Sequence, residues 1–179
     1  QRDDGGRAGK MARVRRYGPG SRAWGKGRSA GEKRKCVLFQ HALCVYPYRR
    51  EIGDFGFCAP LGLELIATVI KPFAKAIDVV DLRKEPGRTP DFIRPETDLV
   101  CFSVNWDRDA DFLLEEISSV PAGIRTVLGG RHASNDPEGW LRSCPNVDIV
   151  VRGDGEEIAG EICRGADIVF HVAAYKHVY

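Results

Sequence analysis

The sequence predicts an α/β domain built on a doubly wound parallel sheet of five strands in the order 2-1-3-4-5. From residue 36 onward, short and uniformly apolar runs alternate with longer amphipathic segments. This pattern is typical of strands buried on both faces and of the helices that cover them. Glycine-containing loops follow several of the apolar runs directly. Right-handed crossovers leave few other arrangements of such units.

Five apolar runs are the predicted strands. They lie within residues 36–46, 77–82, 99–104, 125–128 and 147–151. Each run is short, rich in Val, Leu or Ile, and bounded by turn-forming or charged residues. A sheet of this kind is described as flavodoxin-like or Rossmann-like, and it binds ligands beyond the carboxyl ends of its strands.

Helices are predicted between these strands. The first spans residues 60–71, because proline is tolerated where a helix opens and Pro72 ends it. We expect its apolar side chains to share one face; they are Leu61, Leu65, Ile66, Val69 and Ile70. Three further helices are predicted at residues 109–120, 137–143 and 156–164, the second of them capped by Asp136.

Residues 1–35 differ in composition from the rest of the chain. They carry 12 Lys and Arg against 3 Asp and Glu, whereas residues 36–179 carry 15 against 22. They have almost no apolar periodicity, so we predict a disordered basic tail. A basic arm that binds RNA through Tyr17 and Trp24 is the alternative, and we consider a nucleic-acid partner the less favoured one.

Composition narrows the class of protein further. The six cysteines are scattered through the chain without a CxxC pair or zinc spacing, which indicates reduced thiols and a cytoplasmic location. No run approaches the roughly 18 apolar residues of a membrane span. The first residue is Gln1, so we expect a fragment or an extended reading frame.

Of the loops that follow the predicted strands, two are rich in glycine, and small residues recur in three. Such glycines allow a ligand to approach the backbone, and serine hydroxyls offer hydrogen bonds. The sequence has neither GxGxxG after the first strand nor GxxxxGK[ST], which disfavours ordinary dinucleotide and nucleoside-triphosphate sites.

Three of these segments together resemble the cobalamin-binding domain of radical S-adenosylmethionine enzymes. They are FCAPLGL at residues 57–63, VLGGRHAS at 127–134 and VDIVVRGDGEE at 147–157. That family has a PLGL helix start, a GGxHAS segment and a VRGEGE-like turn in this order, and the resemblance covers residues 42–160. It implies a cobalamin-binding domain over residues 36–164, without catalytic or metal-ligating residues. The cofactor-binding residues that it implies are Pro60, Leu61, Gly62, Ser103, Val104, Asn105, Gly129, Gly130, His132, Ala133, Ser134, Gly153, Gly155 and Glu156.

Cobalamin domains of the mutase and methionine synthase type provide a second comparison. In them, a serine loop and a glycine pair flank the slot for the nucleotide tail of cobalamin. Ser103 lies 26 residues before Gly129, close to that spacing. We therefore expect a side chain at Gly130 to collide with the tail. The DxHxxG motif of these domains is absent, which excludes a histidine lower ligand from residues 56–62.

Radical chemistry in the family needs a [4Fe–4S] cluster on a CxxxCxxC motif, and this sequence has none. The resemblance therefore implies a partner domain, C-terminal to this one, that holds the cluster and S-adenosylmethionine. Residues 165–178, GADIVFHVAAYKHV, instead resemble a segment of polysaccharide-biosynthesis nucleoside-diphosphate-sugar dehydratases. An edge strand at residues 167–173 or a chimeric reading frame are the alternatives for this segment.

Three functions remain open from the sequence. The favoured one is the cobalamin-binding domain of a radical S-adenosylmethionine enzyme, with methyl transfer as a candidate reaction. The first rival is a truncated NAD-dependent nucleoside-diphosphate-sugar epimerase or dehydratase. The second is a non-catalytic flavodoxin-like interaction module.

Overall fold

The computed structural model describes residues 39–49 and 59–163, and the structural statements below concern these residues. The predicted tail at residues 1–35 and the segment at 165–179 lie outside them. The strands are β1 (Phe39–Tyr46), β2 (Ala74–Asp81), β3 (Thr97–Ser103), β4 (Arg125–Gly129) and β5 (Ile149–Val150). The helices are α1 (Leu61–Ile70), α2 (Ala110–Ser118), α3 (Arg131–Asn135), α4 (Pro137–Ser143) and α5 (Gly155–Cys163).

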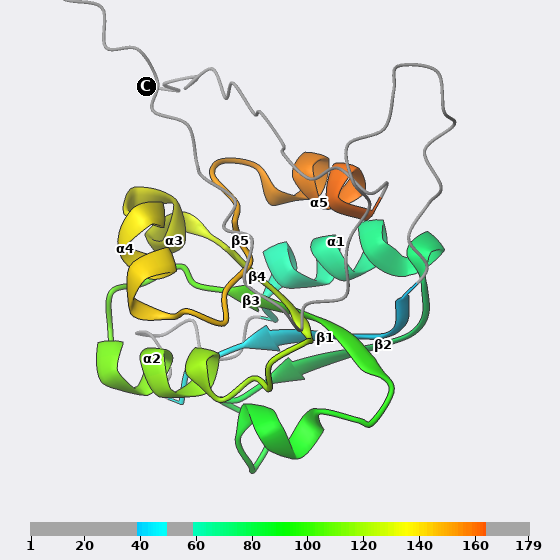
Figure 1. The fold of residues 1–179 in the computed structure, drawn as a ribbon, viewed down its shortest axis with the longest axis horizontal. Helices are drawn as coiled ribbons and strands as arrows, with labels where there is room; N and C mark the ends of the chain where they lie inside the picture. The colour runs from blue at the N-terminus through cyan, green and yellow to red at the C-terminus, as the bar shows by residue number, and fades with distance from the viewer. Residues whose placement is uncertain (1–38, 50–58, 164–179) are drawn as a thin grey trace, which may run out of the picture.

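The sheet confirms the predicted fold class. All four strand pairings are parallel, and the order is β2-β1-β3-β4-β5. Helices α1 and α5 lie side by side over one face, and α2 covers the other (Figure 1). Because all strands run in the same direction, their carboxyl ends and the loops that follow them meet at one edge.

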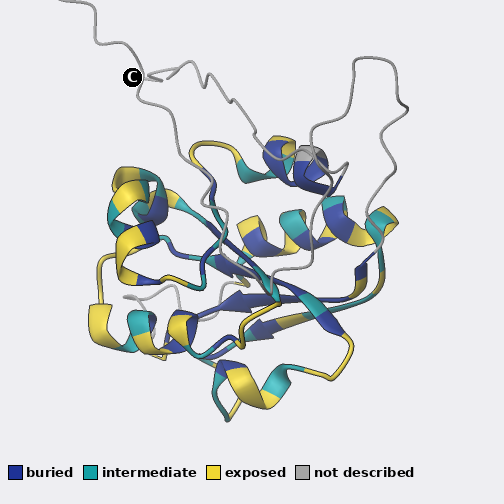
Figure 2. Cartoon of the chain, in the orientation of Figure 1, coloured by how far each residue is buried: buried dark blue, intermediate teal, exposed yellow. Residues whose placement is uncertain are grey.

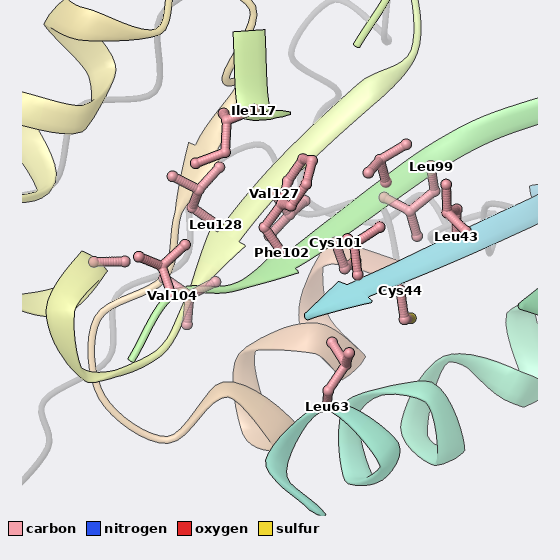
Figure 3. Packing of buried hydrophobic residues seen from close by; sticks show 14 of the residues in the cluster. Leu43, Cys44, Leu63, Leu99, Cys101, Phe102, Val104, Ile117, Val127 and Leu128 are labelled. Atoms are coloured by element: carbon pink, nitrogen blue, oxygen red, sulfur yellow. The ribbon is translucent and has the colours of Figure 1, made fainter. Parts of the chain in front are cut away.

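The core lies between these layers. The central strands β1 and β3 are almost entirely buried, and exposed residues gather on the outer sides of the helices (Figure 2). Leu63 of α1 faces Cys44 of β1 on one side of the sheet, whereas Ile117 of α2 lies near Leu128 of β4 on the other (Figure 3). This two-sided burial explains why the central strands read as continuous apolar runs.

The buried face of α1 agrees with the predicted one at Ile70, and at Ile66 and Val69, which pack against the core, but not at its other two residues. Leu61 and Leu65 are 72% and 45% exposed. The helix instead buries Leu63, Ala67 and Ile70. All of these residues are apolar, so periodicity alone did not show which of them are buried; packing against the sheet and α5 decides this.

Several boundaries also differ from the predicted ones. Strand β2 begins three residues earlier than expected, and β5 is only two residues long. A helical turn, α3, replaces the predicted glycine-rich loop after β4, and Thr89–Phe92 form a short 3-10 helix. No helix in the described part of the chain is long and apolar enough to cross a membrane.

Candidate functional site at the carboxyl edge of the sheet

Two neighbouring central strands end in small residues on the same side of the sheet. Ser103 of β3 and Gly129 of β4 are register partners, two residues beyond the pair Cys101 and Val127. Side chains alternate along a strand and agree across a parallel pair, so all four positions face the same layer. Cys101 pairs in turn with Cys44, which faces α1, so this layer is the one formed by α1 and α5. Ser103 and Gly129 are only half-buried there, although they belong to inner strands.

The two glycines of the predicted pair have different surroundings. A Cβ atom added to Gly129 would touch only Val151 Cβ, at 3.9 Å. A Cβ atom on Gly130 would lie 2.6 Å from the Val104 carbonyl oxygen and 2.7 Å from Asn105 Oδ1. Gly130 also has a φ of +103°, a conformation that side chains disfavour. The fold itself therefore requires glycine at position 130, whereas the backbone at Gly129 is open.

The loop after β3 is bonded directly to the start of α3. The Val104 N–H donates to the Gly129 carbonyl at 2.7 Å. The Val104 carbonyl accepts from the N–H groups of His132 and Ala133, at 3.0 and 3.2 Å. Together with the close approach at Gly130, these bonds leave no gap between Val104 and Gly130.

Polar side chains reinforce this connection. Asn105 Nδ2 donates to Ser103 Oγ at 3.0 Å, and Asn105 Oδ1 accepts from the Arg131 N–H at 3.1 Å. Ser134 Oγ donates to the Gly130 carbonyl at 2.9 Å and accepts from the Gly153 N–H at 3.4 Å. The predicted site residues on the loops after β3, β4 and β5 therefore lie together, and several of them hold the loops in place.

The entrance from α1 and α5 completes the site. Pro60 precedes α1, and Gly62 in its first turn is exposed, with no atom within 4 Å of an added Cβ. Gly155 opens α5, where an added Cβ would lie 3.0 Å from Ile66 Cδ1 of α1. Glu156 is half-buried in the same first turn. Glycine at position 155 thus allows α1 and α5 to approach closely.

Acid–base or metal chemistry finds little support in the described residues. His132 packs edge-on against Trp140, with ring centroids 5.7 Å apart. A hydrogen bond with Cys44 and burial raise the pKa of the Cys101 thiol, so this thiol stays protonated. No group of three or more Cys, His, Asp or Glu side chains within the described ranges is arranged to hold a metal ion. Cys44, Cys101 and Cys144 are buried free thiols, as predicted, and Cys163 is also buried.

Tyr48 is a residue of this edge that the sequence analysis did not identify. It lies two residues beyond β1 and is almost fully buried, at 1% exposure. Its hydroxyl accepts from the N–H groups of Asn105 and Trp106, at 2.9 and 2.8 Å, and donates to the Trp106 carbonyl at 3.0 Å. A tyrosine directly after an apolar run was the available sequence signal, but its partners are 57 and 58 residues away.

The carboxyl end of β2 is closed by an ion pair. Asp81 binds Arg83 through both carboxylate oxygens, with a shortest N–O distance of 2.6 Å. The Arg83 guanidinium also lies 4.6 Å from the ring centroid of Tyr46. In dinucleotide-binding sheets, an acidic residue near this position accepts the ribose hydroxyls. Here the carboxylate is already paired with a buried arginine.

Comparison with known proteins found one relative and no matching protein-family model. The chain is 25% identical over 130 residues to an uncharacterized methyltransferase of Pyrococcus horikoshii, and the match covers 67% of this chain. It spans 28% of that protein's length, so the relative has a large part with no counterpart in this match. No protein-family model matches the chain.

Proposed function

We propose that this domain binds cobalamin and serves a larger methyltransferase as its cofactor-binding part. The observation that best supports this proposal is at the carboxyl ends of β3 and β4. There, the half-buried Ser103 and Gly129 face the layer of α1 and α5. Small residues at this place leave the backbone accessible to a ligand tail. The methyltransferase relative supports the second part of the proposal, because it is a longer protein and this domain matches only a part of it.

Cobalamin fits one side of the predicted slot and not the other. Gly62 is exposed, and a Cβ at Gly129 would meet only Val151, at 3.9 Å, so both positions can lie against a ligand. The gap between Val104 and Gly130 is filled by the protein's own hydrogen bonds. We therefore assign the tail to the Gly129 side, with Ser103 within reach and Gly155 beside it.

Exposed apolar side chains at the same edge fit a large, flat ligand. Leu61 at the start of α1 and Trp106 after β3 are 72% and 42% exposed. Corrin is a broad ring with extensive apolar surface, and its burial against such residues stabilises the complex. When bound, cobalamin supplies a cobalt ion that can carry a methyl group, while the protein binds, orients and shields it.

The nicotinamide rival receives less support from the described residues. The Asp81 carboxylate is paired with Arg83, and the loop after β1 lacks the glycine motif that cradles a pyrophosphate. The segment that suggests a dehydratase, residues 165–178, lies outside the described residues. We consequently keep cobalamin as the proposed ligand.

The test is a titration of the full chain with hydroxocobalamin, followed by equilibrium dialysis and visible absorption of the bound cofactor. Gly129→Ala should weaken binding by roughly tenfold or more, because its Cβ occupies the proposed path. The folded protein should tolerate the same Cβ, which meets only Val151 at 3.9 Å. Arg131→Ala, two residues further along, is the control and should bind like the wild type. Wild-type protein that binds NADH but not hydroxocobalamin would contradict the proposal.

A further inference from the structure

The switch point of this sheet lies between β1 and β3. From β1 the chain moves to β2 on one side, and it then returns to β3 on the other. Ligands of open α/β sheets bind in the crevice at such a point, beyond the carboxyl ends of the two strands. Tyr48 from the end of β1 and Trp106 from the end of β3 meet here.

The Tyr48 hydroxyl is fully used in holding the loop after β3. A phenolic hydroxyl has one proton to donate and accepts two hydrogen bonds at most in this geometry. Its donor serves the Trp106 carbonyl, and both accepted bonds come from the N–H groups of Asn105 and Trp106. The ring packs against Tyr46, with centroids 4.8 Å apart. One side chain therefore fixes both polar backbone groups of Trp106.

The Trp106 side chain is nevertheless left 42% exposed. The three residues that follow, Asp107, Arg108 and Asp109, are charged and exposed. An indole held on a fixed backbone at the edge of a site loses little conformational entropy when a ligand covers it, and it offers a large contact area. Such rigid aromatic anchors dominate binding where they occur.

We propose that Tyr48 is a positioning residue that presents Trp106 as the apolar contact for the flat ligand of this edge. This inference rests on the proposed function, because the ligand is taken to be the corrin ring. Tyr48 is almost fully buried where β1 and β3 end, so we place the ligand over Trp106 rather than between the two strands.

The experiment is a double-mutant cycle on the full chain, with hydroxocobalamin affinity as the readout. Trp106→Ala should weaken binding by roughly tenfold, and Tyr48→Phe by roughly five- to tenfold. If Tyr48 acts through Trp106, Tyr48→Phe should add little in the Trp106→Ala background. Tyr46→Phe removes a hydroxyl from the neighbouring ring without touching the loop, and it should bind like the wild type.

Amide hydrogen exchange separates positioning from a general effect on the fold. Tyr48→Phe should raise the exchange rates of the Asn105 and Trp106 amides while leaving those of the central strands unchanged. Equal losses of affinity from Tyr48→Phe in both backgrounds would overturn the inference, as would Trp106→Ala protein that binds like the wild type. Wild-type protein that does not bind hydroxocobalamin would overturn the proposed function and this inference together. If the wild type binds hydroxocobalamin but the losses of affinity from the two substitutions simply add, the inference is overturned and the proposed function is not.

Discussion

At the scale of single residues, the glycine pair after β4 shows that one motif can combine two physical requirements. Gly130 adopts a φ of +103° and packs against the Val104 carbonyl, so it is needed whether or not a ligand binds. Gly129 has an ordinary backbone conformation and open space beside it. A ligand-binding role can therefore be tested cleanly at Gly129 and not at Gly130.

Gly130→Ala should destabilise the protein without any cofactor present. The added Cβ would meet backbone atoms of Val104, which cannot move away as a flexible side chain could. We expect a loss of at least about 1 kcal/mol in the free energy of unfolding, measured by urea denaturation. Gly129→Ala is the matched control and should leave that free energy unchanged or slightly higher. Equal stability of the two variants would contradict the packing described here.

The Tyr48 hydroxyl should make stability depend on pH in the alkaline range. Burial raises the pKa of Tyr48 to about 12, from an ordinary value of 10.0. Above pH 10 the unfolded chain therefore loses this proton while the folded protein keeps it. Stability should fall between pH 10 and about 12, by at most about 1.4 kcal/mol per pH unit from this group. Measured by urea denaturation between pH 10 and about 12, the free energy of unfolding of Tyr48→Phe should fall less steeply with pH than that of the wild type. The same dependence on pH in both proteins would contradict this prediction.

At the scale of elements, the caps of the helices and the faces that they bury depend on contacts in space that the sequence pattern does not show. Asp136 accepts a hydrogen bond from the Gly139 N–H at 2.9 Å and so caps α4, as predicted. The same arrangement places the Asp136 carboxylate against Gly139, where an added Cβ would lie 2.1 Å from Asp136 Oδ2. A Cβ at position 139 would therefore require the Asp136 carboxylate to leave its present position.

The effect of Gly139→Ala should consequently depend on its background. In the wild type, Gly139→Ala displaces the Asp136 carboxylate, and the lost cap, about 1 kcal/mol, offsets the gain in helix propensity, so the net change in stability should be near zero or slightly destabilising. In Asp136→Ala protein the obstacle is gone, so Gly139→Ala should stabilise α4 by roughly 0.5–1 kcal/mol through helix propensity. Thermal unfolding of the four proteins measures this cycle. A stabilising effect of Gly139→Ala in both backgrounds would show that the cap is not formed.

At the scale of the whole molecule, the two parts of the chain have opposite charge. The net charge of +2 conceals a strongly basic stretch at residues 1–35 and an acidic remainder. The sheet and its helices form a continuous buried core within the described residues.

Deletion of residues 1–35 should leave the unfolding midpoint of the remaining chain nearly unchanged. The reason is the low apolar content of this segment, which gives it little surface to bury against the domain. Calorimetry of the truncated and full chains in the same buffer measures the effect. A fall of more than about 5 °C would indicate that the segment packs on the domain.

The sequence by itself determined the fold class and the order of the sheet, and with them the edge at which we expect a site. Uniformly apolar runs specify doubly covered strands, and right-handed crossovers then leave little freedom in how β1 to β5 are arranged. Residues that mark the start of a helix could also be identified from the sequence, namely Pro60 before α1 and the capping residue Asp136 of α4. These features depend on residues close together in the chain.

The tertiary structure alone decided which residues the site leaves open and which it uses to hold itself together. Gly130 is packed against a carbonyl 26 residues away, and Tyr48 fixes a loop 58 residues away. The exposed side of α1, with Leu61 and Leu65, was likewise set by how the helix rests on the sheet. Contacts of this kind depend on the relative placement of distant segments, and periodicity and motif spacing carry no information about that placement.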